Sequence, residues 1–133
     1  MDHIRRLRPE GLVVSPAFSH VAVVPPGATT VYVGGQNAVG ADGALVGEGD
    51  VAAQSRRALE NARIALAAGG ATLEDVIQWT VLLVEGADLA AGYGAIAAEL
   101  ASDEPPLVTA AIVAGLGVPG ALVEIAAVAA VVR

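Results

Sequence analysis

Glu124 is the residue whose surroundings most strongly indicate chemistry in this sequence. It is the only charged side chain between Glu104 and Arg133, and it lies within the apolar segment 121–127. A lone carboxylate in a buried strand is costly unless it is paired, hydrogen-bonded or partly solvated. Two interpretations are open. Glu124 is either a general acid/base or water-positioning group at a pocket, or a structural glutamate that meets solvent or accepts backbone N–H bonds across an interface.

Cationic side chains are absent from residues 64–132. Carboxylate and phosphate ligands are usually held by arginine or lysine. A site built mainly from the C-terminal half is therefore expected to bind a neutral or cationic metabolite. An anion would need backbone N–H groups or a borrowed cation, for which Arg5, Arg6, Arg8 and His20 are the candidates in the N-terminal half.

Other residues that could do chemistry lack the neighbours they would need. Ser15, Ser19 and Thr109 would act as nucleophiles only beside a base, and the sequence places none there. The Gly34–Gly35 pair lacks the spacing and the lysine of a phosphate-binding loop. The chain has no cysteine and only two, well-separated histidines, so we expect no metal site and no cofactor.

The charge balance argues against two classes of partner. A net charge of −7, from 14 acidic and 7 basic residues, opposes binding to nucleic acid or to an anionic membrane surface. No uninterrupted apolar segment follows Met1–Arg6, so we expect no secretory signal, and the apolar segment 121–132 is too short to span a bilayer. We therefore expect a cytoplasmic protein with a single domain over residues 1–133.

The elements that would position these residues alternate along the chain. Asp50 is the expected N-cap of a helix that ends at Ala68, before Gly69–Gly70. Asp88 is the expected N-cap of a second helix, which ends at about Ala101. β-branched and apolar runs predict the strands 20–24, 29–36, 76–84, 107–114 and 121–132, with a further strand near 4–7 left open. We expect the first two of these strands to be joined by a tight turn at 25–27.

Two helices cannot cover both faces of such a sheet. Yet segments 81–84 and 125–132 are nearly continuous apolar runs, which is typical of strands buried on both faces. We therefore predict an obligate homo-oligomer in which other copies cover the second face. The alternative is that alanine-rich strands simply tolerate exposure.

The same segments resemble a known family. The resemblance covers residues 16–131 and rests on Val31–Gln36, Gln54–Leu66, Asp75–Val81, Pro106–Thr109 and Val123–Val128. Together these are similar to the YjgF/RidA family. The resemblance implies a chorismate-mutase-like α+β fold with two helices packed on one face of the sheet. It also implies a homotrimer whose sheets form a central barrel, with ligand clefts between neighbouring subunits.

The resemblance also implies a reaction, together with a change in this chain. The best-known members hydrolyse reactive imines and enamines, giving a 2-oxo acid and ammonia, and the arginine of a Pro-x-Arg-Ser/Thr motif clamps the substrate carboxylate. Here the motif reads Pro106–Leu107–Val108–Thr109, so Val108 stands in place of the arginine. Losing such a contact costs about 2–5 kcal/mol. We therefore expect activity toward 2-imino acids to be absent or very weak.

Further site residues follow from the same resemblance. Glu124 stands at the glutamate that positions water, and Gly35 at the glycine whose backbone faces the substrate. Phe18 replaces a family tyrosine, and Tyr93 replaces an asparagine on the second helix. With Val108 and Thr109, these complete the expected substrate-binding set.

Two classes of function remain open at this level. The first is a hydrolase in which Glu124 positions water against a neutral or cationic imine, enamine or related substrate. The second is a non-catalytic trimeric protein whose clefts bind a small metabolite. An endoribonuclease is less expected, because the chain is acidic and lacks a histidine/lysine constellation. Trp79, the sole tryptophan, is expected to fill an alanine-rich core.

Overall fold

The structure is a computed structural model that describes residues 3–132. Met1, Asp2 and Arg133 lie outside the described residues, and with them the first two residues of the segment considered for a secretory signal. The elements in chain order are β1 (Arg5–Leu7), β2 (Val21–Val23), β3 (Thr29–Gln36), α1 (Val51–Ala68), the 3₁₀ turn η1 (Leu73–Asp75), β4 (Val76–Val84), α2 (Leu89–Leu100), β5 (Leu107–Val113) and β6 (Val123–Val131).

Both helices begin at the predicted caps. The side chain of Asp50 accepts a hydrogen bond from the Ala53 backbone N–H at 3.0 Å, and that of Asp88 accepts one from Ala91 at 3.1 Å. Each carboxylate thereby satisfies a backbone donor that the first turn of a helix leaves unpaired. Helix α1 ends at Ala68, and the N–H of the following Gly69 bonds back to the last turn. The predicted helices are confirmed to within one residue at their ends.

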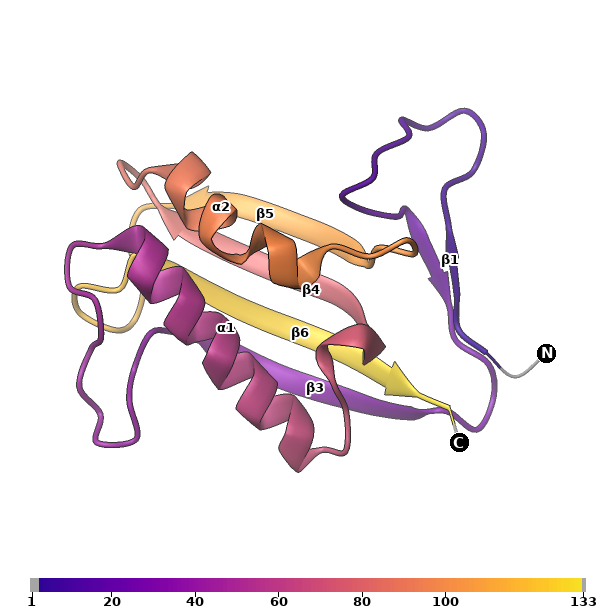
Figure 1. The fold of residues 1–133 in the computed structure, drawn as a ribbon, viewed down its shortest axis with the longest axis horizontal. Helices are drawn as coiled ribbons and strands as arrows, with labels where there is room; N and C mark the ends of the chain where they lie inside the picture. Colours follow the sequence, from indigo (N-terminus) through magenta and orange to yellow (C-terminus); the bar gives the residue numbers. More distant parts are fainter. Residues whose placement is uncertain (1–2, 133) are drawn as a thin grey trace.

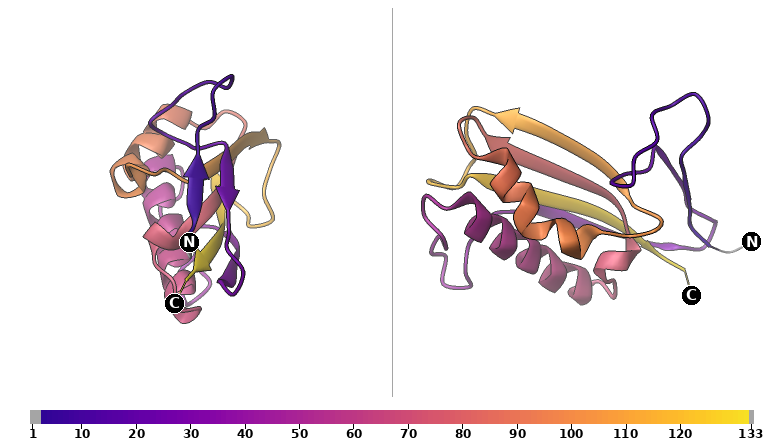
Figure 2. Two further views of the ribbon diagram at one scale, coloured as in Figure 1. Left: turned by 90° about the vertical axis from the view of Figure 1, so that its right-hand side faces the viewer. Right: turned by 45° about the horizontal axis from the view of Figure 1, so that its top comes forward.

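The main sheet has the strand order β3-β6-β4-β5. Strands β4 and β5 are parallel, and the other two pairs are antiparallel. Both helices pack on one face of this sheet, as Figures 1 and 2 show. The expected α+β fold with two helices on one face is therefore confirmed.

No described element of this chain covers the second face of the main sheet, which we call the open face. Because side chains alternate along a strand, the register assigns residues to it. They include Tyr32, Thr80, Leu82, Thr109, Ala111, Glu124, Ala126 and Val128. Tyr32 is 79% exposed there, so a large apolar ring stands in solvent in the single chain.

The turn predicted between β2 and β3 is present, with the Ala28 N–H bonded to the carbonyl of Pro25, but the two strands do not form a hairpin. Strands β2 and β3 are not partners, because β2 pairs with β1 in a separate two-stranded ribbon beside the main sheet (Figure 1). Pro25 and Pro26 lie between β2 and β3. Prolines supply no backbone N–H for a ladder and restrict the residue before them. The ribbon is instead held to the body of the protein by Arg6, whose guanidinium donates to the backbone carbonyls of Glu74 and Val76.

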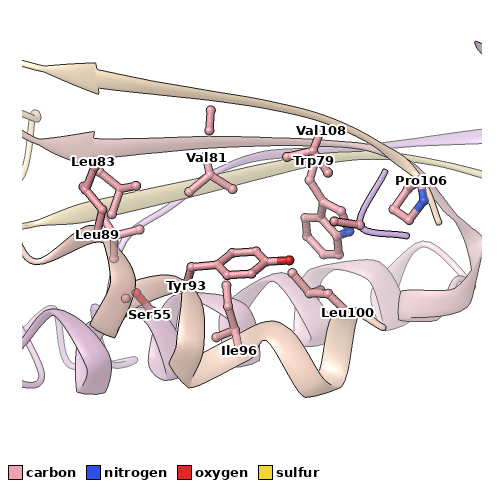
Figure 3. A pocket seen from close by; sticks show the side chains of 14 residues that line it. Ser55, Trp79, Val81, Leu83, Leu89, Tyr93, Ile96, Leu100, Pro106 and Val108 are labelled. Carbon is pink, nitrogen blue, oxygen red and sulfur yellow. The ribbon is translucent and has the colours of Figure 1, made fainter. Parts of the chain in front are cut away.

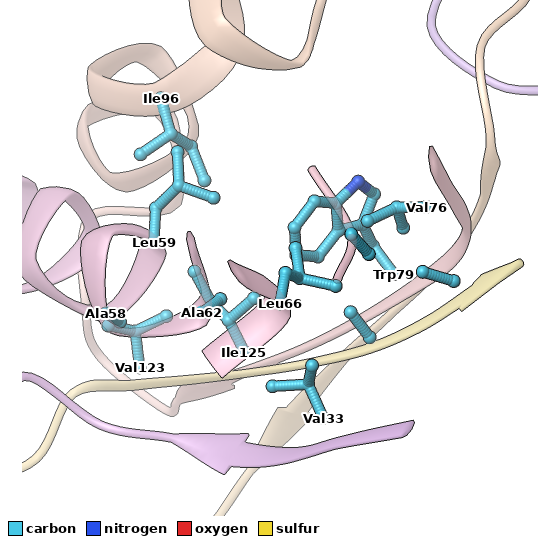
Figure 4. Packing of buried hydrophobic residues seen from close by; sticks show 13 residues of the cluster. Val33, Ala58, Leu59, Ala62, Leu66, Val76, Trp79, Ile96, Val123 and Ile125 are labelled. Atoms are coloured by element: carbon cyan, nitrogen blue, oxygen red, sulfur yellow. The ribbon is translucent and has the colours of Figure 1, made fainter. Parts of the chain in front are cut away.

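The core lies between the helices and the sheet (Figure 4). Valine, alanine, leucine and isoleucine build most of it, and Trp79 is its largest fully buried side chain, at 2% exposure. In Figure 4, Leu59 of α1 lies beside Ile96 of α2, and Leu66 of α1 lies near Trp79. The expectation that Trp79 fills the core is confirmed.

Gln54 is a fully buried polar residue that the sequence reasoning missed. Its amide nitrogen donates to the carbonyls of Gly47 and Gly120, both at 3.2 Å, and its amide oxygen accepts from the Leu122 N–H at 2.8 Å. The side chain thus joins three segments: the loop before α1, the helix itself and the entry to β6. Its position between Val51 and Ala58 in the apolar stripe of α1 was the available signal.

We expect Gln54→Leu to lower the free energy of unfolding by about 1–3 kcal/mol, because it leaves buried backbone groups without a partner. Leucine has a similar volume, so the loss would come from hydrogen bonding rather than from a cavity. Urea denaturation monitored by circular dichroism measures it. Arg56→Leu, on the exposed side of the same helix, is the control and should change stability by less than about 0.5 kcal/mol. An equal loss in both variants would contradict the role of Gln54.

Candidate functional site

An apolar pocket lies between α2 and the β4–β5 edge of the sheet, on the helix-covered face (Figure 3). Its volume is about 290 Å³. Trp79, Val81, Val108 and Ala110 line it from the sheet, and Tyr93 and Ile96 line it from the helix. The Tyr93 ring lies between Ile96 and the sheet, with its hydroxyl pointing toward the Trp79 end. We call this cavity the α2–β5 pocket.

The lining of the α2–β5 pocket carries no charged side chain among the described residues. Its polar side-chain groups are the hydroxyls of Ser55 and Tyr93 and the indole N–H of Trp79. Val108, at the expected arginine position, is 41% exposed and presents an apolar wall. Such a pocket favours an uncharged group, because a charge placed in it would lose its hydration without gaining a partner.

Glu124 and Gly35 meet elsewhere, on the open face near the other edge of the sheet. A Cβ atom built on Gly35 would lie 2.5 Å from Cδ and 2.9 Å from Cγ of Glu124. The carboxylate therefore occupies the space that any larger residue at position 35 would fill. The strand register shifts between Val33 and Gln36, so the glycine pair forms a bulge opposite β6. Bulges of this kind re-aim side chains and are frequent beside active sites.

The Glu124 carboxylate has no hydrogen bond or ion pair within residues 3–132, and the residue is half-buried. Its surroundings are nevertheless held firmly. Asn37 donates to the carbonyl of Val123 at 3.0 Å, directly before Glu124. Asn61 of α1 donates to the carbonyls of Asn37 and Val39, both at 2.9 Å. The backbone around the carboxylate is thus fixed while the carboxylate itself stays available.

The expected site residues therefore form two groups within one chain. Val108 and Tyr93 lie at the α2–β5 pocket, whereas Gly35 and Glu124 lie on the open face. Val123 lines the pocket, so its neighbour Glu124 points to the opposite side of the sheet. The two groups also sit toward opposite edges of the four-stranded sheet. A single small ligand cannot contact both groups in one copy of the chain.

Of the two remaining expected residues, Phe18 lies beside the pocket lining and Thr109 lies on the open face, away from Glu124. Phe18 packs edge-to-face against His20, with ring centroids 5.4 Å apart, and follows Ala17, which lines the pocket. Thr109 lies on the open face of β5, opposite Thr80 of β4. It is separated from β6 by two strand spacings, roughly 10 Å, so it does not touch Glu124 in the same chain.

None of the N-terminal cations lines the α2–β5 pocket. Arg6 is held by backbone carbonyls of η1 and β4, and Arg8 donates to the carbonyls of Ser15 and Asp103. His20 Nε2 lies 2.7 Å from the carbonyl oxygen of Val13. Within one chain these groups do not replace the family's arginine.

Residues 3–132 contain no cluster of three or more histidine, aspartate or glutamate side chains placed to hold a metal ion. Neither helix in this range is both long and apolar enough to cross a membrane.

Several pocket residues escaped the sequence reasoning. Ser55, Gly92 and Leu100 come from two helices and meet only in the folded chain. Gly92 allows α2 to approach α1 closely, because an added Cβ would lie 3.2 Å from Val51 and 3.3 Å from the Ser55 hydroxyl. A glycine and a serine inside otherwise apolar helix faces were the only signals for this pocket.

The fold matches solved structures. A Rid family protein of unknown function from Yersinia pestis, YyfB, shares 31% identity over 97% of this chain and 98% of its own, with a TM-score of 0.82. The YjgF protein of E. coli shares 29% identity over 83% of this chain and 84% of its own, with a TM-score of 0.68. RidA from an Antarctic Psychrobacter shares 28% identity over 91% and 98%, with a TM-score of 0.67.

The sequence itself matches a family model as well. Residues 12–131 match the model described as endoribonuclease L-PSP, which leaves only short terminal segments outside the match. This match, together with the Rid, YjgF and RidA structures, shows that the chain belongs to the YjgF/RidA (Rid) family.

Proposed function

We propose that this protein hydrolyses a small imine or enamine, giving a carbonyl compound and ammonia, at a site completed by two copies of the chain. The observation that carries the proposal is the Glu124 carboxylate, which is half-buried and unpaired within the described residues and lies against the Gly35 backbone. A general base needs a defined place and a free carboxylate. The backbone directly before Glu124 is held by Asn37, and the carboxylate is unpaired within the described residues. The family resemblance assigns it the same task.

The separation of the two site groups supports a site between copies. The α2–β5 pocket lies at the β5 edge of the sheet, and Gly35 lies at the β3 edge. A head-to-tail contact in which these two edges meet would bring Val108 and Tyr93 of one copy to Gly35 and Glu124 of the next. Such contacts generate a closed ring when the rotation between copies closes. The family resemblance makes that ring a homotrimer, and it would also cover the exposed Tyr32 on the open face.

The proposed chemistry uses one water molecule for each substrate. Glu124 accepts a proton from water while the water oxygen bonds to the imine carbon, and it passes that proton to the nitrogen, giving a neutral carbinolamine. Glu124 then takes the hydroxyl proton as the C=O bond forms and gives it to the nitrogen as the C–N bond breaks. Ammonia leaves, and Glu124 is a carboxylate again. In this proposal, backbone groups beside Gly35 orient the reacting atoms. Proton transfer by a positioned carboxylate contributes about 10²–10⁴-fold to such a reaction.

The substrate proposed here does not carry a carboxylate next to the reacting carbon. Val108 lines the pocket where the family's arginine would stand, and Arg6, Arg8 and His20 are engaged with backbone carbonyls. We therefore expect 2-iminobutanoate to be hydrolysed no faster with the protein than without it. The absence of charge in the pocket also fits the second candidate function, in which a non-catalytic protein binds a small neutral metabolite.

Glu124→Gln is expected to lower the rate of imine hydrolysis by at least about 100-fold, because the amide keeps the shape but cannot accept the proton from water. The assay follows aldehyde release from 3-methylbutan-1-imine, generated in situ by oxidation of 3-methylbutylamine. Glu60→Gln, on the exposed side of α1, is the matched control and should leave the rate unchanged.

Stability and binding separate this role from its alternatives. If Glu124 instead accepts backbone N–H bonds across the interface, Glu124→Gln would lower stability by about 1–3 kcal/mol while turnover in the assembled protein persists. That result would contradict the catalytic role. Binding of neutral molecules without any acceleration by the unmodified protein would overturn the hydrolase proposal in favour of the metabolite-binding function.

A further inference from the structure

The α2–β5 pocket carries information about the ligand that the reaction type alone does not supply. We propose that it holds the apolar body of the ligand, so that the ligand is an uncharged molecule with an aliphatic or aromatic tail. The tail would lie between Trp79 and Tyr93, and the reacting polar head would lie at the mouth beside Val108. This inference rests on the proposed function only for the place of the head group. The tail site is complete within one chain.

The chemistry of the lining excludes a charge of either sign. No carboxylate lines the pocket to pair with a cationic tail, and no arginine, lysine or histidine lines it to pair with an anion. Four charged residues, Arg6, Glu74, Glu99 and Glu104, line a separate neighbouring pocket. Trp79, Leu100 and Pro106 border both pockets and form the wall between them. A charged tail would therefore be buried without a partner.

The position of α2 indicates that the pocket is preformed. Asp88 caps the first turn of α2, and Gly92 packs against α1, where Ser55 and Val51 leave no room for a side chain. The helix is thus positioned by α1 rather than by contacts that fill the pocket. Ala110 at the strand edge is too small to close the space from the other side. A volume of about 290 Å³ lies near the lower end of the range for small-molecule sites.

The experiment compares probes with one tail and different charge. 3-Methylbutanamide, 3-methylbutanoate and 3-methylbutylammonium share an isobutyl group, and Trp79, the chain's only tryptophan, reports on the pocket through its fluorescence. We expect the amide to bind at least about tenfold more tightly than either ion, because burial of an unpaired charge is penalised. Each added methylene in the series propanamide, butanamide and pentanamide should tighten binding about fourfold until the pocket is full. The ligand-dependent rise in melting temperature provides a second readout.

Two variants connect the binding to the pocket. Ala110→Phe places a ring in the cavity and should abolish amide binding, whereas Ala98→Phe, at an exposed position of α2 outside the lining, should leave it unchanged. Val108→Arg should reverse the order of the probes by tightening 3-methylbutanoate at least about tenfold. Equal binding of the three probes, or amide binding that survives Ala110→Phe, would overturn the inference. So would the absence of any amide binding, as expected if a side chain of another copy fills the pocket.

The measurements keep this inference separate from the proposed hydrolysis. Glu124 lies on the opposite side of the sheet from the pocket of its own chain, so Glu124→Gln should remove turnover but retain tail binding. Amide binding without turnover would support the tail site and contradict the hydrolase. Glu124-dependent turnover with no preference for the neutral probes would support the hydrolase and contradict the tail site.

Discussion

Gly35→Ala is expected to reduce imine hydrolysis about as severely as Glu124→Gln, by at least about 100-fold. The added methyl group would overlap the Glu124 carboxyl group, with 2.5 Å to its Cδ, so the carboxylate must move. Because the atoms that it meets are the end of a flexible side chain, the shift costs little stability. The variant should therefore melt close to the unmodified protein while its activity is lost. Initial rates and melting temperature, measured on the same sample, check both expectations.

The neighbouring glycine supplies a matched control. A Cβ on Gly34 would meet nothing within 4 Å, and neither glycine has a positive φ, so Gly34→Ala should leave the rate nearly unchanged. The double variant Gly35→Ala/Glu124→Gln should be no slower than either single variant, because both remove the same carboxylate from its position. Equal loss from both glycine substitutions, or additive losses in the double variant, would contradict this account of Gly35.

The helices and strands of the main sheet layer could be predicted because their signals are local. Asp50, Asp88 and the Gly69–Gly70 pair fix the helix ends through contacts a few residues away, and the strands 29–36 and 76–84 are bounded as predicted. The pairing of β2 was not predictable in the same way. Strand β2 could pair with β1 or with the adjacent β3. It pairs with β1, which Arg6 ties to η1 and β4.

The sequence singles out candidate site residues but does not give their arrangement. Glu124 and Val108 stand out in the sequence through a charge where none is expected and an apolar group where a cation is expected. Their placement on opposite sides of the sheet depends on register and on which strands form its edges. These are long-range properties with no local signature. The pocket lining is harder still to predict from the sequence, because Ser55, Trp79 and Val108 come from three separate elements.

Mixing two inactive variants is expected to restore activity, and this is the most direct test of a site between copies. Glu124→Gln keeps the α2–β5 pocket but lacks the carboxylate, whereas Ala110→Phe keeps the carboxylate but fills the pocket. In rings assembled from equal amounts of both, one interface in four would join an intact carboxylate to an open pocket. Activity should therefore recover to about one quarter of that of the unmodified protein. Co-expression followed by rate measurement tests this, with light scattering to confirm the trimer.

A second mixture shows whether the recovery has the proposed cause. In a mixture of Glu124→Gln and Gly35→Ala, both substitutions affect the group formed by Gly35 and Glu124. No interface then contains a working carboxylate, so activity should stay at the level of the single variants. Recovery in both mixtures would show that turnover does not need this carboxylate. No recovery in either, with mixed rings demonstrated by native mass spectrometry, would place the site within one chain. Because the sheet separates Glu124 from the pocket of the same chain, one ligand could not contact both. Either Glu124 or the pocket would then have no part in the reaction.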